Sequence, residues 1–471
     1  MKTVFDRHVD PRLIDRSLAD SAFGSMWLDE LGAARPEFPA LAGPLRCDLL
    51  VVGGGYTGLW TALHAAQQDP SADIVLIEAD RIGWAASGRN GGFVEASLIH
   101  GTENGRSRWP DELPALKALG LENLNGMQDE IERLGIDAEW ERTGMLSVAV
   151  EPHQVEWLRE AAAAGEGQFL DREQVCAQLS SPTYLAGLFD PDTCALVNPA
   201  KLAVGLARAC AEAGVAVYEH SAATALRSVG AGIHVEAAGH DLIAERVVLA
   251  TNVFPSLLRR NRLHTVPVYD YVLATEPLSP QQLERIGWTG RQGVADSGNQ
   301  FHYYRLSADN RILWGGYDAV YHFGRRVDPA YEHRPASYRR LAAHFFLTFP
   351  QLSDLRFAHR WAGAIDTNSR FCAHWGSAYD GRVAHVNGFT GLGVAAARFG
   401  ADVCLDLVNG RQTERTRLEM VRTTPLPFPP EPLASLGIQA ARWSLDRADH
   451  RAGRRNVFLR TLDRLGLGFD S

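Results

Sequence analysis

The chain has little lysine and no excess of positive charge. Lysine occurs at only three of 471 positions, Lys2, Lys117 and Lys201, so arginine supplies almost all of the cationic side chains. Asp and Glu (56) outnumber Lys and Arg (47), which gives a formal net charge of −9. A protein with this balance lacks the basic surface that nucleic-acid binding needs, so we expect no nucleic-acid partner.

Cysteine motifs and long apolar runs are missing as well. The six cysteines are Cys47, Cys176, Cys194, Cys210, Cys372 and Cys404. They form no C-x-x-C pair, and no His/Cys cluster has the spacing of a zinc site, so we expect reduced thiols and no metal site. No apolar run is long enough to span a bilayer, and the charged residues 1–20 contain no apolar core. We therefore expect a cytoplasmic protein without a transmembrane helix or a signal peptide.

The most informative feature that is present is a glycine-rich turn after an apolar run. Residues Leu49–Val52 lead into Gly53, Gly55 and Gly58, which follow the pattern G-x-G-x-x-G, and a helical pattern comes next. The first glycine permits a tight turn, the second lets the backbone approach a pyrophosphate, and the third lets the helix pack closely on the strand. The helix N-terminus then offers free N–H groups and a positive dipole end to phosphates.

A second apolar run, Ile74–Ile77, ends at Glu78, where a carboxylate can accept hydrogen bonds from an adenosine ribose. An acid at this point disfavours a 2′-phosphate. Strand, turn, helix, strand and acid in this order indicate a bound ADP-containing cofactor rather than a glycine-rich turn that binds nothing. These residues alone leave FAD and NAD open.

Hydrophobic periodicity predicts further elements along the chain. We expect helices over residues 112–135, 153–180 and 199–213, a helical run after residue 393, and a basic amphipathic helix over 439–464. We expect strands over residues 144–150, 215–220, 232–239, 246–250, 266–275 and 383–388, and over 300–317 with a turn at 308–310. The small residues of 80–92 predict a loop.

In this order the pieces resemble the D-amino-acid-oxidase-like FAD-dependent oxidoreductase superfamily, from about residue 45 to about residue 410. Four motifs carry the resemblance: GGGYTG with Glu78, then GWAASGRNGG, VVLATN and NGFTGLG. The first occurs in many flavoproteins, whereas ASGRNGG and NGFTGLG are more specific. Within the superfamily, the chain most resembles the gamma-glutamylputrescine oxidase-like amine oxidases.

The resemblance implies an α/β (α+β) fold. Its parts are a Rossmann-like FAD-binding domain, a discontinuous antiparallel-sheet substrate domain and a C-terminal helical extension. The expected bounds are 1–46 for an N-terminal lead-in, 47–100, 190–265 and 355–410 for the FAD-binding domain, 101–189 and 266–354 for the substrate domain, and 411–471 for the extension.

The resemblance also implies that the cofactor is FAD. The residues expected to bind it are Gly53, Gly55, Tyr56, Thr57, Gly58, Glu78, Ala79, Ser87, Gly88, Arg89, Asn90, Gly91, Gly92, Thr251, Gly388, Thr390, Gly391, Leu392 and Gly393. The loop Ser87–Gly92 would wrap the pyrophosphate and the edge of the isoalloxazine ring. The helix after Gly388–Gly393 would point its positive N-terminus at the pyrimidine end and stabilise the anionic reduced flavin.

The resemblance places the substrate on a sheet face that covers the flavin. The candidates there are Tyr269, Tyr271, His302, Tyr303, Tyr304, Arg305, Trp314 and Tyr317. Aromatic walls can hold a cationic amine, although aromatic residues on strands more often belong to the core. The residues assigned to catalysis or to the substrate pocket are His302, Tyr304, Trp361 and Asp366, of which His302 or Asp366 could assist deprotonation.

Two departures from the family pattern bear on the substrate and on the electron acceptor. Alpha-amino-acid oxidases carry an Arg in the stretch matching Trp361–Asp366, where this chain has Ile365 and Asp366. Asp366 suits an ammonium group, and a capping role is the alternative. Sarcosine-oxidase-like members use a Lys near flavin N5 for the reaction with oxygen, and this chain has Trp314 at that position. Those members also attach FAD through a Cys in the stretch matching Arg360–Asp366, where this chain has no cysteine. We therefore expect non-covalent FAD, and either another cation for the oxygen reaction or another acceptor.

The sequence thus predicts an FAD-dependent oxidoreductase that oxidises a C–N bond of a small primary or N-methylated amine. Hydride passes to flavin N5, the imine hydrolyses to an aldehyde or keto product plus ammonia or an amine, and O2 is the expected acceptor. Arg305, Arg325 and Arg326 are candidates for holding a distal anionic group. One alternative is a dehydrogenase that reduces a quinone or a carrier protein. The other is an NAD(P)-binding sensor, and the motifs ASGRNGG and NGFTGLG argue against the sensor. The amine and the oligomeric state stay open.

Overall fold

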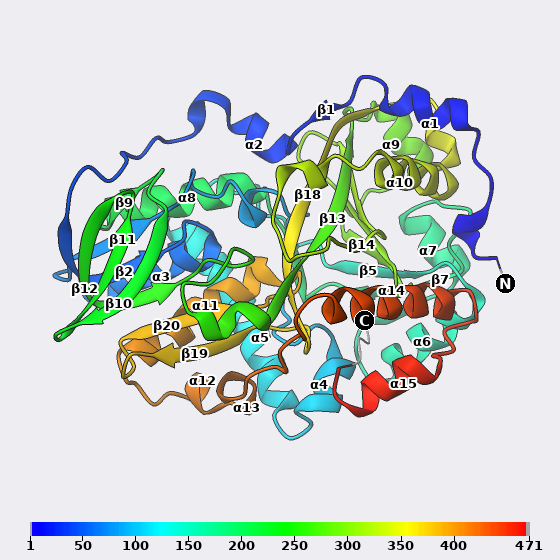
Figure 1. Cartoon of the computed structure of the whole chain (residues 1–471). Helices are drawn as coiled ribbons and strands as arrows, with labels where there is room; N and C mark the ends of the chain where they lie inside the picture. The colour runs from blue at the N-terminus through cyan, green and yellow to red at the C-terminus, as the bar shows by residue number, and fades with distance from the viewer. Residues whose placement is uncertain (1, 468–471) are drawn as a thin grey trace.

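The computed structural model describes residues 2–467 and contains two sheets that lie side by side (Figure 1). The strands of the first sheet are β2 (Leu45–Val52), β3 (Ile74–Ile77), β9 (Ala216–Tyr218), β10 (Ala223–Val229), β11 (Gly232–Ala237), β12 (His240–Leu249), β19 (His374–Ala378) and β20 (Val383–Asn387). They lie in the order β10-β11-β12-β2-β3-β9, with β20 on β12 and β19 on β20.

The second sheet is larger and mostly antiparallel. Its strands are β1 (Ala22–Phe23), β5 (Met145–Ala149), β6 (Gln168–Leu170), β7 (Ala186–Asp190), β13 (Thr265–Thr275), β14 (Gly293–Asp296), β15 (His302–Leu306), β16 (Ile312–Gly316), β17 (Val320–Tyr321) and β18 (Phe357–Asn368). They lie in the order β1-β18-β13-β16-β15-β14-β5-β7-β6, with β17 also on β13. Two short strands, β4 (Phe93–Glu95) and β8 (Cys194–Leu196), pair separately.

The helices cover both sheets and the space between them. They are α1 (Pro11–Leu18), α2 (Met26–Leu31), α3 (Tyr56–Gln68), α4 (Thr102–Arg108), α5 (Leu113–Arg133), α6 (Pro152–Ala163), α7 (Arg172–Gln178), α8 (Pro199–Glu212), α9 (Pro280–Ile286), α10 (Pro335–Thr348), α11 (Gly393–Val408), α12 (Glu414–Arg417), α13 (Glu419–Arg422), α14 (Leu433–Asp449) and α15 (Val457–Arg464). None of the helices described within residues 2–467 is long and apolar enough to cross a membrane.

The centre of the first sheet is parallel and buried on both faces. β2 runs parallel to β3 on one side and to β12 on the other. Leu49 and Val51 join the cluster under the helices, whereas Leu50 and Val52 join a second cluster on the opposite face. Burial on both faces explains why this strand is a continuous apolar run.

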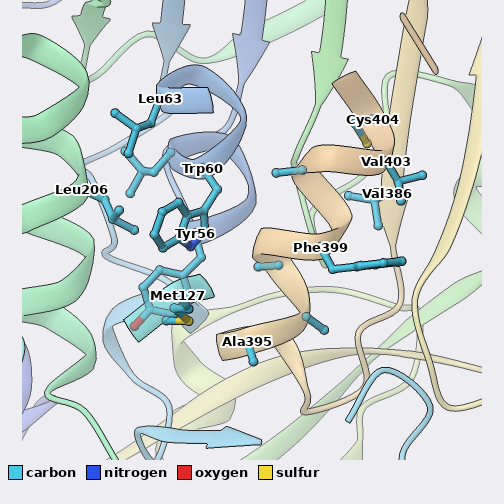
Figure 2. Packing of buried hydrophobic residues seen from close by; sticks show 14 of the residues in the cluster. Tyr56, Trp60, Leu63, Met127, Leu206, Val386, Ala395, Phe399, Val403 and Cys404 are labelled. Carbon is cyan, nitrogen blue, oxygen red and sulfur yellow. The ribbon is translucent and has the colours of Figure 1, made fainter. Parts of the chain in front are cut away.

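Helices α3, α8 and α11 form the layer on one face of the first sheet. In Figure 2, Tyr56, Trp60 and Leu63 of α3 lie between Leu206 of α8 and the apolar side of α11. Trp60 is fully buried. This packing fixes the start of α3 relative to the start of α11, and both helix N-termini belong to the site described below.

The second sheet presents one face to α10 and the other to the first sheet. Its longest ladder joins β13 to β18, from Thr265 opposite Asn368 to Thr275 opposite Phe357. On the α10 side, Trp314 packs edge-on against Phe345, with their ring centroids 5.6 Å apart. On the opposite face, Val268, Asp270, Val272 and Tyr303 line a cavity.

The structure confirms most of the predicted elements and corrects two. The helix predicted over 153–180 is interrupted, because Gly165 and Gly167 adopt positive φ and β6 pairs with β7. The helix predicted over 439–464 is two helices, α14 and α15, with a break that contains Gly453 at φ 75°.

The strand pairing also crosses the predicted domain bounds. Residues 355–410 were assigned to the FAD-binding domain, yet β18 lies within the second sheet because its whole length pairs with β13. Likewise α5, within residues 101–189, contributes to the core under α3 and α11. The N-terminal lead-in takes part in the fold through β1, which pairs with β18.

Candidate active site

The glycine fingerprint forms a cradle in which side chains cannot fit. Gly53 has φ 116°, and an added Cβ there would lie 2.5 Å from the carbonyl oxygen of Ala250. A Cβ on Gly58 would lie 1.8 Å from the carbonyl oxygen of Gly53. The start of α3 therefore sits directly on the β2 turn, and backbone atoms line the space in front of Gly55, which caps the helix.

Glu78 is a buried carboxylate at the end of β3 that organises this cradle. It accepts hydrogen bonds from the backbone N–H of Gly54 at 2.6 Å, from that of Asp80 at 3.0 Å and from the indole N–H of Trp84 at 3.0 Å. Glu78 also lines the cavity, where the sequence predicts its contact with a ribose.

The loop Ser87–Gly92 is held tightly at the same cavity. The Ser87 hydroxyl accepts the backbone N–H of Tyr56 at 3.0 Å, which joins the loop to the start of α3. Two buried indoles hold its backbone: Trp361 donates to the carbonyl of Arg89 at 2.8 Å, and Trp27 donates to that of Asn90 at 3.0 Å. Trp361, predicted in the substrate pocket, does not line the cavity and instead positions this loop.

The Arg89 guanidinium ties the loop to the second sheet. Its Nη1 forms an ion pair with Glu332 at 2.7 Å and donates to the carbonyl of Ala362 at 3.3 Å. Its Nε donates to the carbonyl of Trp84. Arg89 lines the cavity, but these donors are engaged with the protein.

Asp366 holds the turn that opens α11. Its carboxylate accepts the backbone N–H of Gly388, and the Thr390 hydroxyl donates to the carbonyl of Gly388. Burial raises the pKa of Asp366 to about 7, although hydrogen bonds from backbone N–H groups, Gly388 first, act in the opposite direction. These contacts are those of the capping role that the sequence left as the alternative.

A central cavity of about 1450 Å³ connects these motifs. The predicted cofactor residues that line it are Gly53, Gly55, Tyr56, Thr57, Glu78, Ala79, Ser87, Arg89, Asn90, Gly91, Thr251, Thr390, Gly391, Leu392 and Gly393. Gly58, Gly88, Gly92 and Gly388 are not among its lining residues. At each of these four an added Cβ would collide with neighbouring atoms, so they serve close packing.

On the second sheet, Asp270 of β13 and Tyr303 of β15 face the cavity. The Tyr303 hydroxyl donates to Asp270 at 2.5 Å. Burial raises the pKa of Asp270 to about 6, although the hydrogen bond from Tyr303 acts in the opposite direction. The Tyr303 ring lies against Gly91, where an added Cβ would be 2.7 Å from it. The cofactor loop and a carboxylate–phenol pair therefore meet in the same cavity.

His302 and Tyr304 point away from the cavity, which corrects their predicted place in the substrate pocket. Successive side chains of a strand alternate between its faces, so the neighbours of Tyr303 lie on the α10 side. There His302 contacts Asp296 at 2.6 Å and His344 at 2.9 Å, and the Tyr304 hydroxyl meets that of Tyr184 at 2.6 Å. Trp314 lies on this side too, so it does not occupy the position of a cation beside the flavin.

Of the remaining residues predicted from the sequence, some line the cavity and others form hydrogen bonds elsewhere in the protein. Tyr317 lines the cavity, whereas Tyr269 and Tyr271 donate to the backbone carbonyls of Asp328 and Tyr331. Arg305 is buried and donates to the carbonyl of Val197 at 2.6 Å. Arg325 donates to the carbonyl of Pro429 at 2.7 Å. Among residues 2–467, neither Arg325 nor Arg326 lines the cavity.

Several cavity residues were missed by the sequence reasoning. Glu95 lies in the wall, and burial raises the pKa of its carboxyl group. Arg262 and Arg442 are further lining residues. Of the described residues 2–467, no cysteine and no lysine lines the cavity. Asp270 could have been found only as a polar residue inside an otherwise apolar strand.

A flavin dinucleotide fits this arrangement. The turn at Gly53 and Gly55 and the N-terminus of α3 line the cavity, and helix N-termini with exposed backbone N–H groups suit a pyrophosphate. The cavity continues past the loop at Asn90 and Gly91 to the N-terminus of α11, so one elongated ligand can contact all four motifs. Its volume exceeds the usual range for a single small ligand, which leaves room for a substrate.

Comparison with known proteins gives the same result. A gamma-glutamylputrescine oxidoreductase of Escherichia coli (strain K12) is 31% identical over 406 residues, 83% of this chain and 90% of that protein. A probable oxidoreductase OrdL of Rhizobium meliloti (strain 1021) is 30% identical over 428 residues, 86% of this chain and 92% of that protein. The glycine oxidase structure from Geobacillus kaustophilus shares the fold, with a TM-score of 0.66 and 21% identity over 80% of this chain and 98% of that one.

The family model described as FAD dependent oxidoreductase matches residues 48–407, which contain all four motifs. That match covers most of the chain, and the two relatives extend over more than four fifths of it. The chain therefore belongs to the D-amino-acid-oxidase-type family of FAD-dependent oxidoreductases, and its cofactor is FAD.

Proposed function

We propose that this enzyme oxidises a C–N bond of an amine whose nitrogen binds at Asp270 and Tyr303. The observation that carries the proposal is the 2.5 Å pair of these two side chains, which packs on the cofactor loop at Gly91. FAD, when bound, accepts a hydride from the carbon next to the nitrogen. Water then hydrolyses the imine to an aldehyde or ketone plus ammonia or a smaller amine.

Asp270 attracts the ammonium form and takes its proton. With a pKa of about 6 the carboxylate is mostly ionised at neutral pH, yet it lies close enough to neutrality to accept a proton during binding. The Tyr303 hydroxyl and backbone N–H groups of Tyr271 and Gly316 hold the carboxylate, which fixes its place in the cavity wall. Deprotonation supplies the nitrogen lone pair that imine formation requires.

The charges of the cavity favour an amine over an alpha-amino acid. Asp270 and Glu95 line it, besides Glu78, which organises the cofactor cradle, and Asp366, which holds the turn before α11. Of the lining arginines, Arg89 is paired with Glu332, Arg262 follows β12 and Arg442 belongs to α14. None of these three arginines belongs to a strand of the second sheet, which carries Asp270 and Tyr303. The name of the Escherichia coli relative, a gamma-glutamylputrescine oxidoreductase, agrees with an amine substrate.

O2 is the proposed acceptor, and a dehydrogenase that reduces a quinone or a carrier protein is the alternative. The composition of the cavity wall supports the alternative, because none of Lys2, Lys117 and Lys201 lines the cavity to serve as the cation for the oxygen reaction. Oxygen uptake with formation of H2O2 during amine turnover supports the oxidase. Flavin reduction by the amine without reoxidation in air supports the dehydrogenase.

The substitution Asp270→Asn tests the amine proposal. We expect kcat/KM to fall at least 100-fold, the usual scale for a lost general base. We also expect the decline of the wild-type profile below about pH 6 to disappear, because the group that titrates there is removed. Anaerobic bleaching of the flavin absorbance by amines gives the rate without any acceptor.

Two further variants make the test specific. Tyr303→Phe should lower kcat/KM about tenfold, the loss of one hydrogen bond to a charged group. The matched control is Tyr304→Phe, which removes the hydroxyl of the neighbouring tyrosine on the opposite face. The proposal is wrong if Asp270→Asn retains wild-type flavin reduction with an unchanged pH profile.

A further inference from the structure

The C-terminal extension, residues 411–467, forms one wall of the central cavity. The side of α14 that faces inward carries Ala434, Gly437, Ile438, Ala441 and Leu445, and Leu462 of α15 continues it. These α14 residues recur at helical spacing on one face, so they form a continuous strip. The extension lies outside residues 48–407, the part that matches the family model.

The wall is attached to the substrate-binding side of the second sheet. Asp449, at the end of α14, accepts the backbone N–H of Asn299 at 3.0 Å and its side-chain amide at 2.6 Å. At the start of the helix, Glu431 accepts the Tyr321 hydroxyl and the backbone N–H of Gly324. Hydrogen bonds at both ends of α14 therefore fix the compartment between this helix and strands β15–β17.

Apolar side chains dominate this compartment and its rim. Phe301, just before β15, and Ala319, just before β17, line the cavity from the second sheet, and Ile438 lines it from α14. Leu426 and Leu433 also line the cavity, and they are 57% and 61% exposed. Asn299 and Gln300 also line this part of the cavity, but Asp449 accepts their backbone N–H groups and the Asn299 amide. Against the apolar residues of α14, an apolar group is stabilised by leaving water.

We propose that the substrate is an amine that carries an apolar chain or ring. Its nitrogen binds at Asp270 and Tyr303, and its apolar part occupies the compartment under α14. This inference rests on the proposed function and names its substrate class. Arg442 and Tyr317 are polar lining residues of this region, and their aliphatic and aromatic parts can cover an apolar group.

The first test measures how flavin reduction depends on the length of the substrate. Holoenzyme is mixed anaerobically with butylamine, hexylamine or octylamine, and the bleaching of the flavin gives a second-order rate constant for each. We expect this constant to rise roughly fourfold for each methylene that is buried. Octane-1,8-diamine should react far more slowly than octylamine, because its second ammonium would enter the apolar compartment. A flat series, or a diamine as good as octylamine, overturns the inference.

The variant Gly437→Leu tests whether the compartment under α14 holds the chain. An added Cβ at Gly437 meets no atom within 4 Å, so a side chain is accommodated in the helix and projects into the cavity. We expect it to abolish the gain from butylamine to octylamine, because the added side chain takes the space of the outer methylenes. Leu436→Gln, on the neighbouring exposed position, is the matched control and should retain the gain. Retention of the gain in Gly437→Leu overturns the inference.

Binding of alkyltrimethylammonium ions separates this inference from the proposed function. These ions cannot lose a proton from nitrogen, so their Kd, measured from perturbation of the flavin spectrum, is independent of turnover. A Kd that falls with chain length while no amine reduces the flavin refutes the proposed function and retains the apolar compartment. Amines that reduce the flavin, with Kd independent of chain length, refute the inference and retain the function.

Discussion

At Asp366 a buried carboxylate supports the turn that directs α11 toward the cofactor cavity. The carboxylate accepts the Gly388 N–H, and burial raises its pKa to about 7. In the unfolded chain the same group titrates near its ordinary value of 3.8. The folded protein therefore binds this proton more tightly, so the stability from Asp366 is full below about pH 4 and is lost as the pH rises through about 7.

We expect Asp366→Asn to reduce the loss of stability between pH 5 and pH 8. The amide oxygen still accepts the Gly388 N–H, while the buried charge is gone. Asp366→Ala, in contrast, leaves that N–H unpaired and should cost about 1–3 kcal/mol at both pH values. Thermal unfolding of the two variants measures both effects. An Asp366→Asn protein with wild-type stability and a greatly raised KM for amines would instead show that Asp366 binds substrate.

The sequence identifies a residue when its role depends on neighbours that are close in the chain. Gly53 and Gly58 act on atoms within a few residues, so the motif alone predicts them. The choice between Tyr303 and Tyr304 depends on which face of β15 covers the cofactor, and that is set by α10 on the other side. Asp270 gains its role from Tyr303, two strands away in the sheet, and no local pattern reports such a pair.

At the scale of elements, a buried ionic cluster joins three helices behind the cofactor cradle. His64 of α3 contacts Asp402 of α11 at 2.7 Å and Glu130 of α5 at 3.0 Å, and Arg398 donates to Glu130 at 2.8 Å. Burial lowers the pKa of His64, but hydrogen bonds and charges from Asp402 and Glu130 outweigh it, and the net pKa is raised. The pKa of Glu130 is lowered to about 2, because His64 and Arg398 outweigh its burial.

We expect His64→Asn to destabilise the protein by about 3 kcal/mol at pH 6, the scale for removing one partner from a buried ion pair. Since the pKa of His64 is raised on folding, its contribution is full below about 6.5 and is lost as the pH rises through the higher folded value. The loss should therefore shrink by pH 9. Denaturant unfolding at the two pH values measures this, with exposed His8→Asn as the control. An equal loss at both pH values contradicts a charged His64.

The two misjudged helices show where periodicity stops being sufficient. Residues 153–180 have helical spacing, but β6 forms because β7 offers an open edge, a partner that local sequence does not reveal. Within 439–464 the signal was present: Asn456 caps α15 by accepting the Leu459 N–H at 2.9 Å, and Gly453 ends the preceding turn. Elements that pair within one βαβ unit, such as β2 and β3, were predicted to within a few residues.

At the scale of the whole molecule, the C-terminal extension lies outside the matching family region and forms one side of the cavity. Phe428 donates its N–H to the carbonyl of Leu263, and Gln439 donates to the carbonyl of Tyr321. Together with Asp449, these contacts attach the extension at Phe428, within α14 and at the end of α14. The wall can move only if several of them break, so access to the cavity and attachment of the extension are coupled.

We expect Asp449→Ala to loosen this wall without preventing folding. Asp449 accepts hydrogen bonds from two successive backbone N–H groups, those of Asn299 and Gln300, and Asp449→Ala removes them, whereas the neighbouring His450 keeps its 3.0 Å contact with Asp6. Limited proteolysis with trypsin should then cut the segment 450–456, which contains Arg451, Arg454 and Arg455, several times faster than in wild type. Arg447→Ala, on the exposed face of the same helix where Arg447 stacks on Trp443, should not change the cleavage rate.

Because the same helix forms the apolar wall, Asp449→Ala should also reduce the advantage of octylamine over butylamine. Faster cleavage with an unchanged advantage of octylamine over butylamine would mean that α14 holds the apolar chain of the substrate without the Asp449 contacts.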